Sequence, residues 1–523
     1  MSENRIPFER YPGLSPLFLD FLRGLPEFFP DPPTIAASVA RGRELLGTPS
    51  RVPLSAWRYR GDAGRSAAEA LGAGRAVASV AGHQVGLFTG PLYTLTKAFD
   101  TLRVARELKE RGVEAAPVFW ALTDDHDLEE VARTARPGPG GPQVLVVEGA
   151  DRANRRPVGP LPVPNRAREL LEAFRADARA ADAAKSLQDF ERRYAAGQTY
   201  AGAFVETLLD LVSPEPLLVL DPYQDGLRGA MADFFAIAVE KREALRATMR
   251  DAADRLERAG KPVAVPYRDD VFPFFLIEDG ERRRVTDPVD ALRRVRAGAA
   301  WPSTDVLTRP VLKSFLLPTA ATVLGPAEIA YHAQALALFP LFGVRPPVLL
   351  PRSHLVLLGP GERRAAEALG VPAAELLSEP RPTPEGSILE AEQVVQIAKA
   401  LDGSLAALEP ELKKIDPALS ASLETTRQKA AFPLVQLTDR IRKAAERKDV
   451  TTTNRRRRLE TMLRPGGTAA ERLYPPLVPM LAYGREALGV IRDAATGSLE
   501  GAAVVNLGAA EPVAGPEGEE RAR

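Results

Sequence analysis

The sequence predicts an α/β protein built on a parallel sheet, with a helical hairpin toward its C-terminal end. Residues 75–80 form a short apolar run rich in small and β-branched side chains, and residues 115–122 form another. Between them, apolar residues recur at helical spacing from Leu92 until Gly112, which ends the helix. Strand, helix and strand over about fifty residues make a βαβ unit, which requires a parallel sheet and a right-handed crossover.

The alternation of strands and helices continues along the chain. A loop at 137–141 leads to a predicted strand at 143–148, and helical periodicity covers 165–211. A strand at 217–220 is followed by helices to about residue 259 and by a strand-rich stretch at 263–285. Residues 307–350 resume the α/β rhythm and end in the apolar strand 348–350.

A heptad repeat begins after Glu390. Leucine or isoleucine occupies positions 401, 405, 408, 412, 415 and 419, and a second apolar series follows at 434, 437, 441 and 444. Pro410 and Pro417 argue against one uninterrupted helix, because proline removes an amide donor and crowds the preceding turn. Two interpretations stay open: an antiparallel hairpin that projects and dimerises, or two amphipathic helices packed on the main body.

Composition narrows the function. Lys plus Arg and Asp plus Glu both total 69, so a zero net charge gives no reason to expect nucleic acid as a partner. The absence of cysteine excludes disulfides, thiolate catalysis and cysteine-ligated zinc. No signal peptide is visible, and no apolar run approaches the ~20 residues that span a bilayer. We therefore expect a cytoplasmic protein that does not enter the membrane.

A glycine-rich segment, AGHQVGLFTGPLY at residues 81–93, follows the first predicted strand. Gly82, Gly86 and Gly90 let backbone amides approach a ligand, and the helix that follows presents unpaired N–H groups to an anion. In an open α/β sheet, the carboxyl end of a strand is where ligands bind. The spacing is not that of the dinucleotide fingerprint, and no phosphate-loop lysine follows Gly90.

An acidic segment, TDDHD at residues 123–127, follows the second predicted strand. Asp124, Asp125 and Asp127 around His126 could serve as a general base, a divalent metal site or contacts for a substrate amine. The alternative is an aspartate-capped helix start with solvated charges. Because adjacent parallel strands end at the same edge, we expect this segment to face the glycine-rich segment across one cleft.

Two later segments add candidates. Glu328 and Tyr331 lie in a predicted helix that begins after Gly325-Pro326; the alternative role for Glu328 is to complement the helix dipole. Arg352 follows the strand 348–350 and is suited to bind a carboxylate or phosphate through two parallel hydrogen bonds. His332 and His354 are candidates too, although a lone histidine is more often a hydrogen-bonded core residue.

These segments, in this order, resemble the cysteine ligase family of bacillithiol biosynthesis. The resemblance is carried by GHQVGLFTGPLYTLTKA (82–98), PVFWALTDDHDLEEV (117–131), RPVLKSFLLPT (309–319), GPAEIAYHAQ (325–334) and PPVLLPR (346–352), with a weaker echo in PGGTAAERLYP (465–475). It implies a Rossmann-like core with helical connecting insertions and an α-helical coiled coil that makes a homodimer. It also implies the last step of bacillithiol synthesis, which joins cysteine through its carboxyl group to the amine of glucosaminyl-malate.

On this basis we expect a core at 1–385 with a helical insertion at about 165–260, a coiled-coil hairpin at 386–464, a segment packing on the core at 465–506 and a disordered tail at 507–523. The predicted catalytic residues are Asp125, His126 and Asp127. The predicted substrate- or nucleotide-binding residues are Gly82, His83, Gln84, Gly86, Thr89, Gly90, Tyr93, Asp124, Glu328, Tyr331 and Arg352. His83, Asp124 and His332 depart from the family, which usually has Gln, Glu and Trp there.

The predicted mechanism follows from the resemblance. Amide formation needs an activated carboxyl group, so ATP is a candidate cosubstrate and Mg²⁺ a candidate ion. The glycine-rich segment would hold a phosphate or carboxylate, Asp125 and Asp127 would orient the amine or Mg²⁺, His126 would take a proton, and Arg352 would hold an anion such as malate. The rivals are a ligase for another amino acid or amino sugar, a non-catalytic coiled-coil scaffold and a metal phosphohydrolase.

Overall fold

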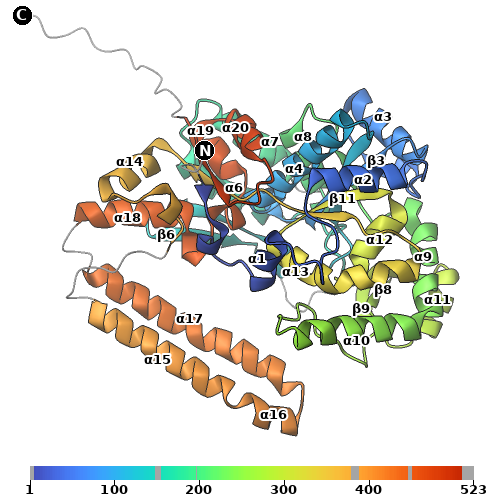
Figure 1. The fold of residues 1–523 in the computed structure, drawn as a ribbon. Helices are drawn as coiled ribbons and strands as arrows, with labels where there is room; N and C mark the ends of the chain where they lie inside the picture. Colours follow the sequence, from blue (N-terminus) through green and yellow to red (C-terminus); the bar gives the residue numbers. More distant parts are fainter. Residues whose placement is uncertain (1–4, 148–154, 196, 379–387, 446–449, 509–523) are drawn as a thin grey trace, which may run out of the picture.

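A six-stranded sheet forms the centre of the computed structural model, which describes residues 5–147, 155–195, 197–378, 388–445 and 450–508 (Figure 1). Its strands lie in the order β12 (Val348–Pro351), β11 (Thr319–Leu324), β3 (Val77–Gln84), β4 (Ala115–Leu122), β7 (Leu218–Leu220) and β2 (Trp57–Arg58). The first five are parallel, and β2 pairs antiparallel with β7. After β3, the chain adds β4 and β7 on one side and then β11 and β12 on the other, so the strand order reverses between β3 and β11. In such sheets, ligands bind at this switch point.

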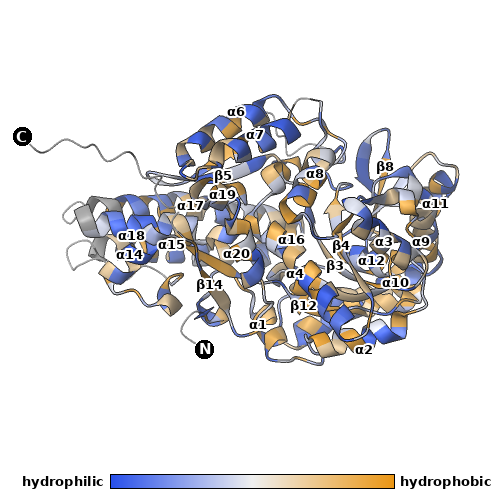
Figure 2. Ribbon diagram, turned by 90° about the horizontal axis from the view of Figure 1, so that it is seen from above, coloured by the Kyte–Doolittle hydropathy of each residue, from blue (hydrophilic) through white to orange (hydrophobic). Residues whose placement is uncertain are grey.

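Helices cover both faces of the sheet because successive strand residues point to opposite sides. In β3, Val77 and Ala81 pack into one core, and Ala78 and Val80 into the other. The first core holds α2 (Ile35–Leu45), α4 (Leu92–Glu110) and α8 (Tyr200–Val212); the second holds α3 (Gly61–Gly72), α9 (Arg228–Glu240) and α12 (Thr308–Leu316). Hydrophobic residues gather on the strands and on the inward sides of these helices (Figure 2).

The predicted βαβ unit is confirmed closely. Helix α4 spans Leu92–Glu110, strand β4 spans Ala115–Leu122, and Gly112 adopts a positive φ of 79° after the helix. The first strand is longer than predicted, because Gly82, His83 and Gln84 continue β3 instead of starting a loop. Pairing of His83 with Ala121 and of Gln84 with Leu122 extends the ladder through these residues.

Other segments agree less well. The predicted helical insertion contains α6 (Arg166–Phe174), α7 (Ala183–Arg193), α8, α9 and α10 (Arg242–Arg258). The strand predicted at 217–220 is confirmed as β7, but it belongs to the central sheet and divides this insertion in two. Residues 263–273 hold no strand; only β8 (Phe274–Glu278) and β9 (Glu281–Arg284) form there, in an antiparallel sheet with β10 (Trp301–Thr304). The loop predicted at 137–141 is mostly a hairpin of β5 (Arg133–Gly138) and β6 (Gly141–Val146).

A helical hairpin projects from the body of the molecule (Figure 1). It consists of α15 (Ile388–Ala406), the short α16 (Glu409–Ile415) and α17 (Leu419–Ala445), with a break at Pro417. The Arg427 guanidinium joins α17 to α15 through two 2.8 Å hydrogen bonds to Asp402. Much of the heptad seam stays uncovered within one chain: Leu408 is 49% exposed and Ile415 is 75% exposed.

The chain then returns to the core. Helix α18 (Val450–Leu463) packs on α14 (Pro360–Leu369), where Arg458 pairs with Glu362 at 2.6 Å. Strand β14 (Ala502–Asn506) lies between β1 (Arg5–Ile6) and β13 (Leu355–Leu358). Leu507, assigned above to the tail, is buried, and residues 509–523 of that predicted tail lie outside the described residues.

The remaining helices are α1 (Pro16–Leu22), α5 (Leu128–Val131), α11 (Pro288–Arg296), α13 (Pro326–Ala335), α19 (Leu477–Tyr483) and α20 (Ala487–Ala494). Across the described ranges, no helix combines the length and apolarity needed to cross a bilayer.

Candidate active site

Polar side chains meet where β3, β4 and β11 end. The Gln84 amide donates to Asp125 Oδ2 at 3.0 Å, so the glycine-rich and acidic segments are in direct contact at one edge of the sheet. His83, Tyr93, His126 and Glu328 are partly exposed around this edge, as is Asp125. Six predicted site residues, Gln84 included, thus come together at or beside the switch point of the strand order, and we call this group the polar edge.

A buried ion pair lies at the centre of this edge. Lys97 Nζ contacts Glu328 Oε2 at 2.5 Å and donates to the Gly82 carbonyl at 2.9 Å, and the Gly325 amide donates to the same carboxylate oxygen at 2.6 Å. The Lys97 side chain is 2% exposed and that of Glu328 is 22% exposed. Burial raises the pKa of Glu328, but the charge and hydrogen bond of Lys97 outweigh burial and lower it. Glu328 is therefore a carboxylate held in place by an ammonium group.

Sequence reasoning missed Lys97. It lies within GHQVGLFTGPLYTLTKA and follows Tyr93 by four residues, which places both on one side of α4. A lysine among the buried residues of a helix needs a charged partner, and that rule was the available signal. The partner, Glu328, lies 231 positions away and is not visible from local spacing.

Helix α12 contributes Arg309 and Lys313, which sequence reasoning also passed over although RPVLKSFLLPT contains both. Arg309 Nη2 lies 3.8 Å from Asp125 Oδ2. Lys313 Nζ lies 5.8 Å from the centre of the Trp120 ring. Burial lowers the pKa of Lys313 to about 8. The positive charges of Arg309 and Lys97 also lower it, whereas the negative charge of Glu328 raises it.

Arg282 of β9 organises the acidic segment. Its Nη1 donates to Asp125 Oδ1 at 3.3 Å and to His126 Nδ1 at 2.8 Å. Because arginine stays protonated, His126 Nδ1 must be the acceptor, and the ring proton lies on Nε2. The 3.4 Å approach of Nδ1 to Asp125 is then a contact and not a donated hydrogen bond. Burial raises the pKa of Asp125, but the charges of Arg309 and Arg282 and the 2.8 Å hydrogen bond from the His126 backbone amide hold it well below its usual range.

Asp124 and Asp221 form a second, more buried acidic pair. Asp124 Oδ2 accepts from Ser303 at 2.6 Å, while its buried Oδ1 has no hydrogen-bond partner among the described residues. Thr123 donates to Asp221, and burial raises the pKa of Asp221 to about 6. The ends of β4 and β7 thus place a carboxylate with an unused acceptor atom beneath the exposed edge.

His83 and Tyr93 form a neutral pair. His83 Nδ1 donates to the Gln84 carbonyl at 3.1 Å, so Nε2 accepts from the Tyr93 hydroxyl at 2.7 Å. Burial and the charge of Lys97 lower the pKa of His83 to about 4, and burial raises that of Tyr93 to about 12. Near neutral pH, this pair presents no charge to the site.

Two protein-family models match this chain. The model described as "Bacillithiol biosynthesis BshC, N-terminal Rossmann-like domain" matches residues 55–301 and 291–353. The model described as "Bacillithiol biosynthesis BshC, C-terminal coiled-coil domain" matches residues 384–502. This chain belongs to the BshC family. The resemblance and the predicted fold class, a Rossmann-like α/β core with a coiled-coil domain, are confirmed.

Relatives in the BshC family cover most of the chain. Proteins named "Putative cysteine ligase BshC" from Solibacter usitatus and Salinibacter ruber are 29% and 27% identical over 78% and 82% of this chain, and over 80% and 83% of their own. A solved structure described as a putative arginyl-tRNA synthetase from Campylobacter jejuni aligns over 80% of this chain and 92% of its own, at 12% identity. Its TM-score of 0.24 is too low to support a conclusion.

The glycine-rich segment of this BshC member is packed instead of open. Gly86, Thr89 and Gly90 are buried, and the Thr89 amide donates to the Tyr194 hydroxyl at 2.9 Å. The first amide of α4, from Leu92, donates to the Tyr474 carbonyl at 2.7 Å. These two amides, which were expected to receive an anion, are occupied by protein groups. The segment instead positions His83 and Tyr93.

Arg352 is also already bound. Its Nη1 donates to Glu471 Oε1 and to the Ser353 carbonyl, both at 2.7 Å, and its guanidinium lies 4.7 Å from the centre of the Tyr93 ring. Tyr11 donates to the same Glu471 oxygen at 2.5 Å. Arg352, which was predicted to hold malate, therefore forms an internal ion pair that connects the end of β12 to the C-terminal segment.

Three further candidates are structural. Asp127 Oδ1 accepts from the Glu130 amide at 2.9 Å and caps α5, as the alternative interpretation foresaw. His332 donates to the Glu328 carbonyl and stacks on Tyr331, while burial lowers its pKa to about 4. His354 donates to the Arg352 carbonyl within an aromatic cluster, and burial lowers its pKa well below the usual range.

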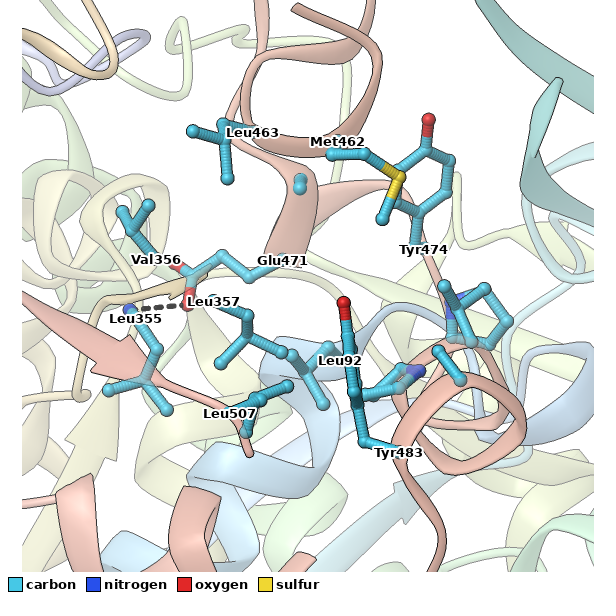
Figure 3. Close-up of a pocket in the computed structure, with 15 residues that line it drawn as sticks. Leu92, Leu355, Val356, Leu357, Met462, Leu463, Glu471, Tyr474, Tyr483 and Leu507 are labelled. Carbon is cyan, nitrogen blue, oxygen red and sulfur yellow. Dashed lines mark hydrogen bonds between the residues drawn. The ribbon is translucent and has the colours of Figure 1, made fainter. Parts of the chain in front are cut away.

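An apolar cavity lies beside Glu471, the residue that pairs with Arg352 (Figure 3). Leu92, Tyr474 and Tyr483 line it, and the Glu471 carboxylate at its edge accepts from the Leu355 amide at 2.8 Å. It is separate in character from the polar edge, because its walls are almost entirely hydrocarbon.

The donor set does not suit a protein-held Mg²⁺. The carboxylate of Asp125 is bound to Gln84 and Arg282, and that of Asp127 caps a helix. Over the described part of the chain, no group of three His, Cys, Asp or Glu side chains is arranged to hold a metal ion. We assign no step to a metal.

Proposed function

We propose that this chain is a ligase that joins cysteine, through its carboxyl group, to the amine of glucosaminyl-malate in the last step of bacillithiol biosynthesis. The observation that carries the proposal is the match to both BshC domains, together with relatives named as cysteine ligases. The polar edge at the switch point supports it, because it offers fixed charges of both signs to a zwitterionic and an anionic substrate. Both substrates are cytoplasmic metabolites, so we propose that the reaction takes place there.

The chemistry needs an activated carboxyl group. In the proposed reaction, a cysteine carboxylate oxygen attacks a phosphorus atom of ATP, releasing pyrophosphate or ADP and leaving an acyl-adenylate or acyl-phosphate. The neutral amine then attacks the carbonyl carbon, the C–N bond forms, the C–O bond to AMP or phosphate breaks, and the amine loses one proton. A divalent ion would accompany the phosphates of ATP and would not occupy a protein cluster.

The side chains of the polar edge are suited to binding and orienting the substrates. Asp125, ionised at working pH, suits a contact with a substrate ammonium group. The same low pKa makes it a weak base, and His126 Nδ1 is occupied by Arg282, so neither is well placed to accept a proton at that atom. The Lys97–Glu328 pair forms a rigid charged wall beside them.

Product analysis tests the proposal. Purified protein is incubated with cysteine, glucosaminyl-malate and ATP, and product mass and nucleotide products are followed by mass spectrometry. We expect the amide only when all three are present, with AMP or ADP formed in equal amount. Product from a different amine or amino acid, and none from these two, would favour the related-ligase alternative and refute the substrate assignment.

We also propose that the hairpin makes a homodimer. Leu408, Ile415, Phe432 and Val435 are between 49% and 75% exposed on α16, α17 and the connection between α15 and α16, an apolar area that a second hairpin would cover. Light scattering after size-exclusion chromatography should give twice the 56.5 kDa chain mass. The Ile415→Glu, Phe432→Glu variant should give the chain mass with unchanged far-UV circular dichroism; a monomeric wild type contradicts the proposal.

A further inference from the structure

The inward side of α12 carries two positive side chains one helical turn apart. Arg309 and Lys313 are four residues apart, so they lie one above the other on the same face. Like charges at this spacing destabilise a helix, and more so where water is partly excluded. The Arg309 side chain is 13% exposed, and Lys313 is half-buried. The arrangement therefore requires negative charge nearby.

Burial lowers the pKa of Arg309, but Asp125, Asp124 and Asp305 outweigh burial and raise it, so the protein supplies negative charge mainly to Arg309. Asp125 lies 3.8 Å from Arg309 Nη2, but the buried Arg309 Nε has no hydrogen-bond partner among the described residues. Lys313 forms no hydrogen bond or ion pair with any residue in the described ranges, and its ammonium group lies 5.8 Å from the centre of the Trp120 ring. Glu328 is the carboxylate that acts on Lys313, yet its Oε2 is taken by Lys97 and the Gly325 amide.

Lys313 is partly exposed at the edge of the sheet, so an anion from solution can reach it. Gly82 of β3 packs closely against Trp120, and a Cβ added there would also come within 3.4 Å of Lys313 Nζ. Burial, with the charges of Arg309 and Lys97, lowers the pKa of Lys313 to about 8, so the ammonium form still predominates at pH 7. An anion placed there would satisfy Lys313 and relieve the repulsion along α12.

We infer that Arg309 and Lys313 form an oxyanion-binding subsite at the carboxyl edge of the sheet, which takes a carboxylate or phosphoryl group of a substrate. Both groups offer several acceptor oxygens on one atom, which suits a guanidinium and an ammonium group one turn apart. Naming the bound molecule as a substrate rests on the proposed function, whereas the binding of the anion does not. Lys313 is a specificity residue in this account, because it decides which substrate group lies at the switch point.

Titration calorimetry tests the subsite with L-malate and, separately, inorganic phosphate at pH 7.0. We expect one site per chain for at least one of them, and the tighter probe identifies the group as carboxylate or phosphoryl. Lys313→Met should weaken binding at least tenfold and Lys313→Arg should retain most of it. Lys109→Met is the matched control, because Lys109 is 64% exposed and pairs with Glu114 far from the edge. Binding by Lys313→Met as tight as wild type, or no binding of either anion to wild type at millimolar concentration, overturns the inference.

A second measurement needs no variant. Reductive methylation of the wild-type chain, with modified lysines quantified by peptide mass spectrometry, should show Lys313 protected by the tighter-binding probe and Lys109 unprotected. Equal modification of Lys313 with and without saturating anion refutes the subsite even if the variants fail to fold. The product assay separates the two proposals: Lys313-dependent anion binding without ligation leaves the subsite standing and removes the proposed function, and ligation without such binding does the reverse.

Discussion

Replacing Lys97 by methionine isolates the buried carboxylate of Glu328. Methionine keeps most of the aliphatic packing but removes the ammonium group that contacts Glu328 at 2.5 Å and the Gly82 carbonyl at 2.9 Å. Removing one partner of a buried ion pair costs about 3–5 kcal/mol. Because Glu328 retains 22% exposure, the lower value of about 3 kcal/mol applies, and the lost hydrogen bond to Gly82 adds about 1 kcal/mol. We expect the free energy of unfolding to fall by about 4 kcal/mol at pH 7.5.

The loss should depend on pH in a defined direction. In the wild type, Lys97 holds the folded-state pKa of Glu328 below 4.5, so this pair's contribution is present above that pH and is lost as pH falls through the lowered value. Without Lys97, burial raises the pKa of Glu328 from this lowered value, opposed only by the Gly325 amide and the charge of Lys313, so the variant gains less stability from ionised Glu328 than the wild type does. The difference between the two proteins should therefore shrink as the pH is lowered from 7.5 toward 5.

The double variant Lys97→Met, Glu328→Gln is the control. With both charges gone, we expect a loss of only about 1 kcal/mol, mainly from the unpaired Gly82 carbonyl. Equilibrium urea unfolding followed by tryptophan fluorescence measures these values, because all three tryptophans pack in the core beside the sheet. A single variant as stable as wild type at pH 7.5, or a double variant no better than the single one, would refute the reasoning.

Three further variants follow from the contacts. Asp125→Asn removes the carboxylate that bonds the buried Arg282 and approaches Arg309; it should lower the ligation rate at least tenfold and cost about 3 kcal/mol in urea unfolding, because a buried guanidinium loses its charge partner, and an unchanged rate contradicts the assignment. Gly82→Ala places a Cβ 2.8 Å from a backbone oxygen of the neighbouring strand, and should cost about 2 kcal/mol in urea unfolding; no change in midpoint contradicts the close approach. Glu471→Gln weakens a fully buried ion pair, and should cost about 3 kcal/mol without changing the KM for cysteine.

The βαβ unit could be predicted because its signals are local. Periodicity within α4 and the apolar run of β4 each arise from a face that must be buried, and Gly112 ends the helix through its own conformation. The fate of the glycine-rich segment could not be predicted in this way. Its closure depends on Tyr194 of the chain after α7, about a hundred positions away, whose hydroxyl takes the amide that appeared free for an anion.

The same limit explains Arg352 and Lys97. An arginine after a strand predicts an anion site, but Glu471, 119 positions later, already binds Arg352. A lysine within a helix predicts a solvated face, but the side chain of Lys97 is buried against β3 and Glu328. Sequence spacing places residues along an element, whereas pairing across elements decides which charges remain for a substrate.

The topology explains why the two lysines meet at one glycine. Helices α4 and α12 lie on opposite faces of the sheet, so Lys97 and Lys313 can approach each other only where β3 ends and no side chain separates them. Gly82 meets that condition: its carbonyl binds Lys97, and the space of its missing Cβ lies beside Lys313. Lys97 contacts Glu328 at 2.5 Å, whereas Lys313 has no hydrogen bond or ion pair among the described residues, although the charge of Glu328 acts on it. A substrate anion would therefore bind more favourably at Lys313 than at Lys97, because no internal carboxylate has to be displaced.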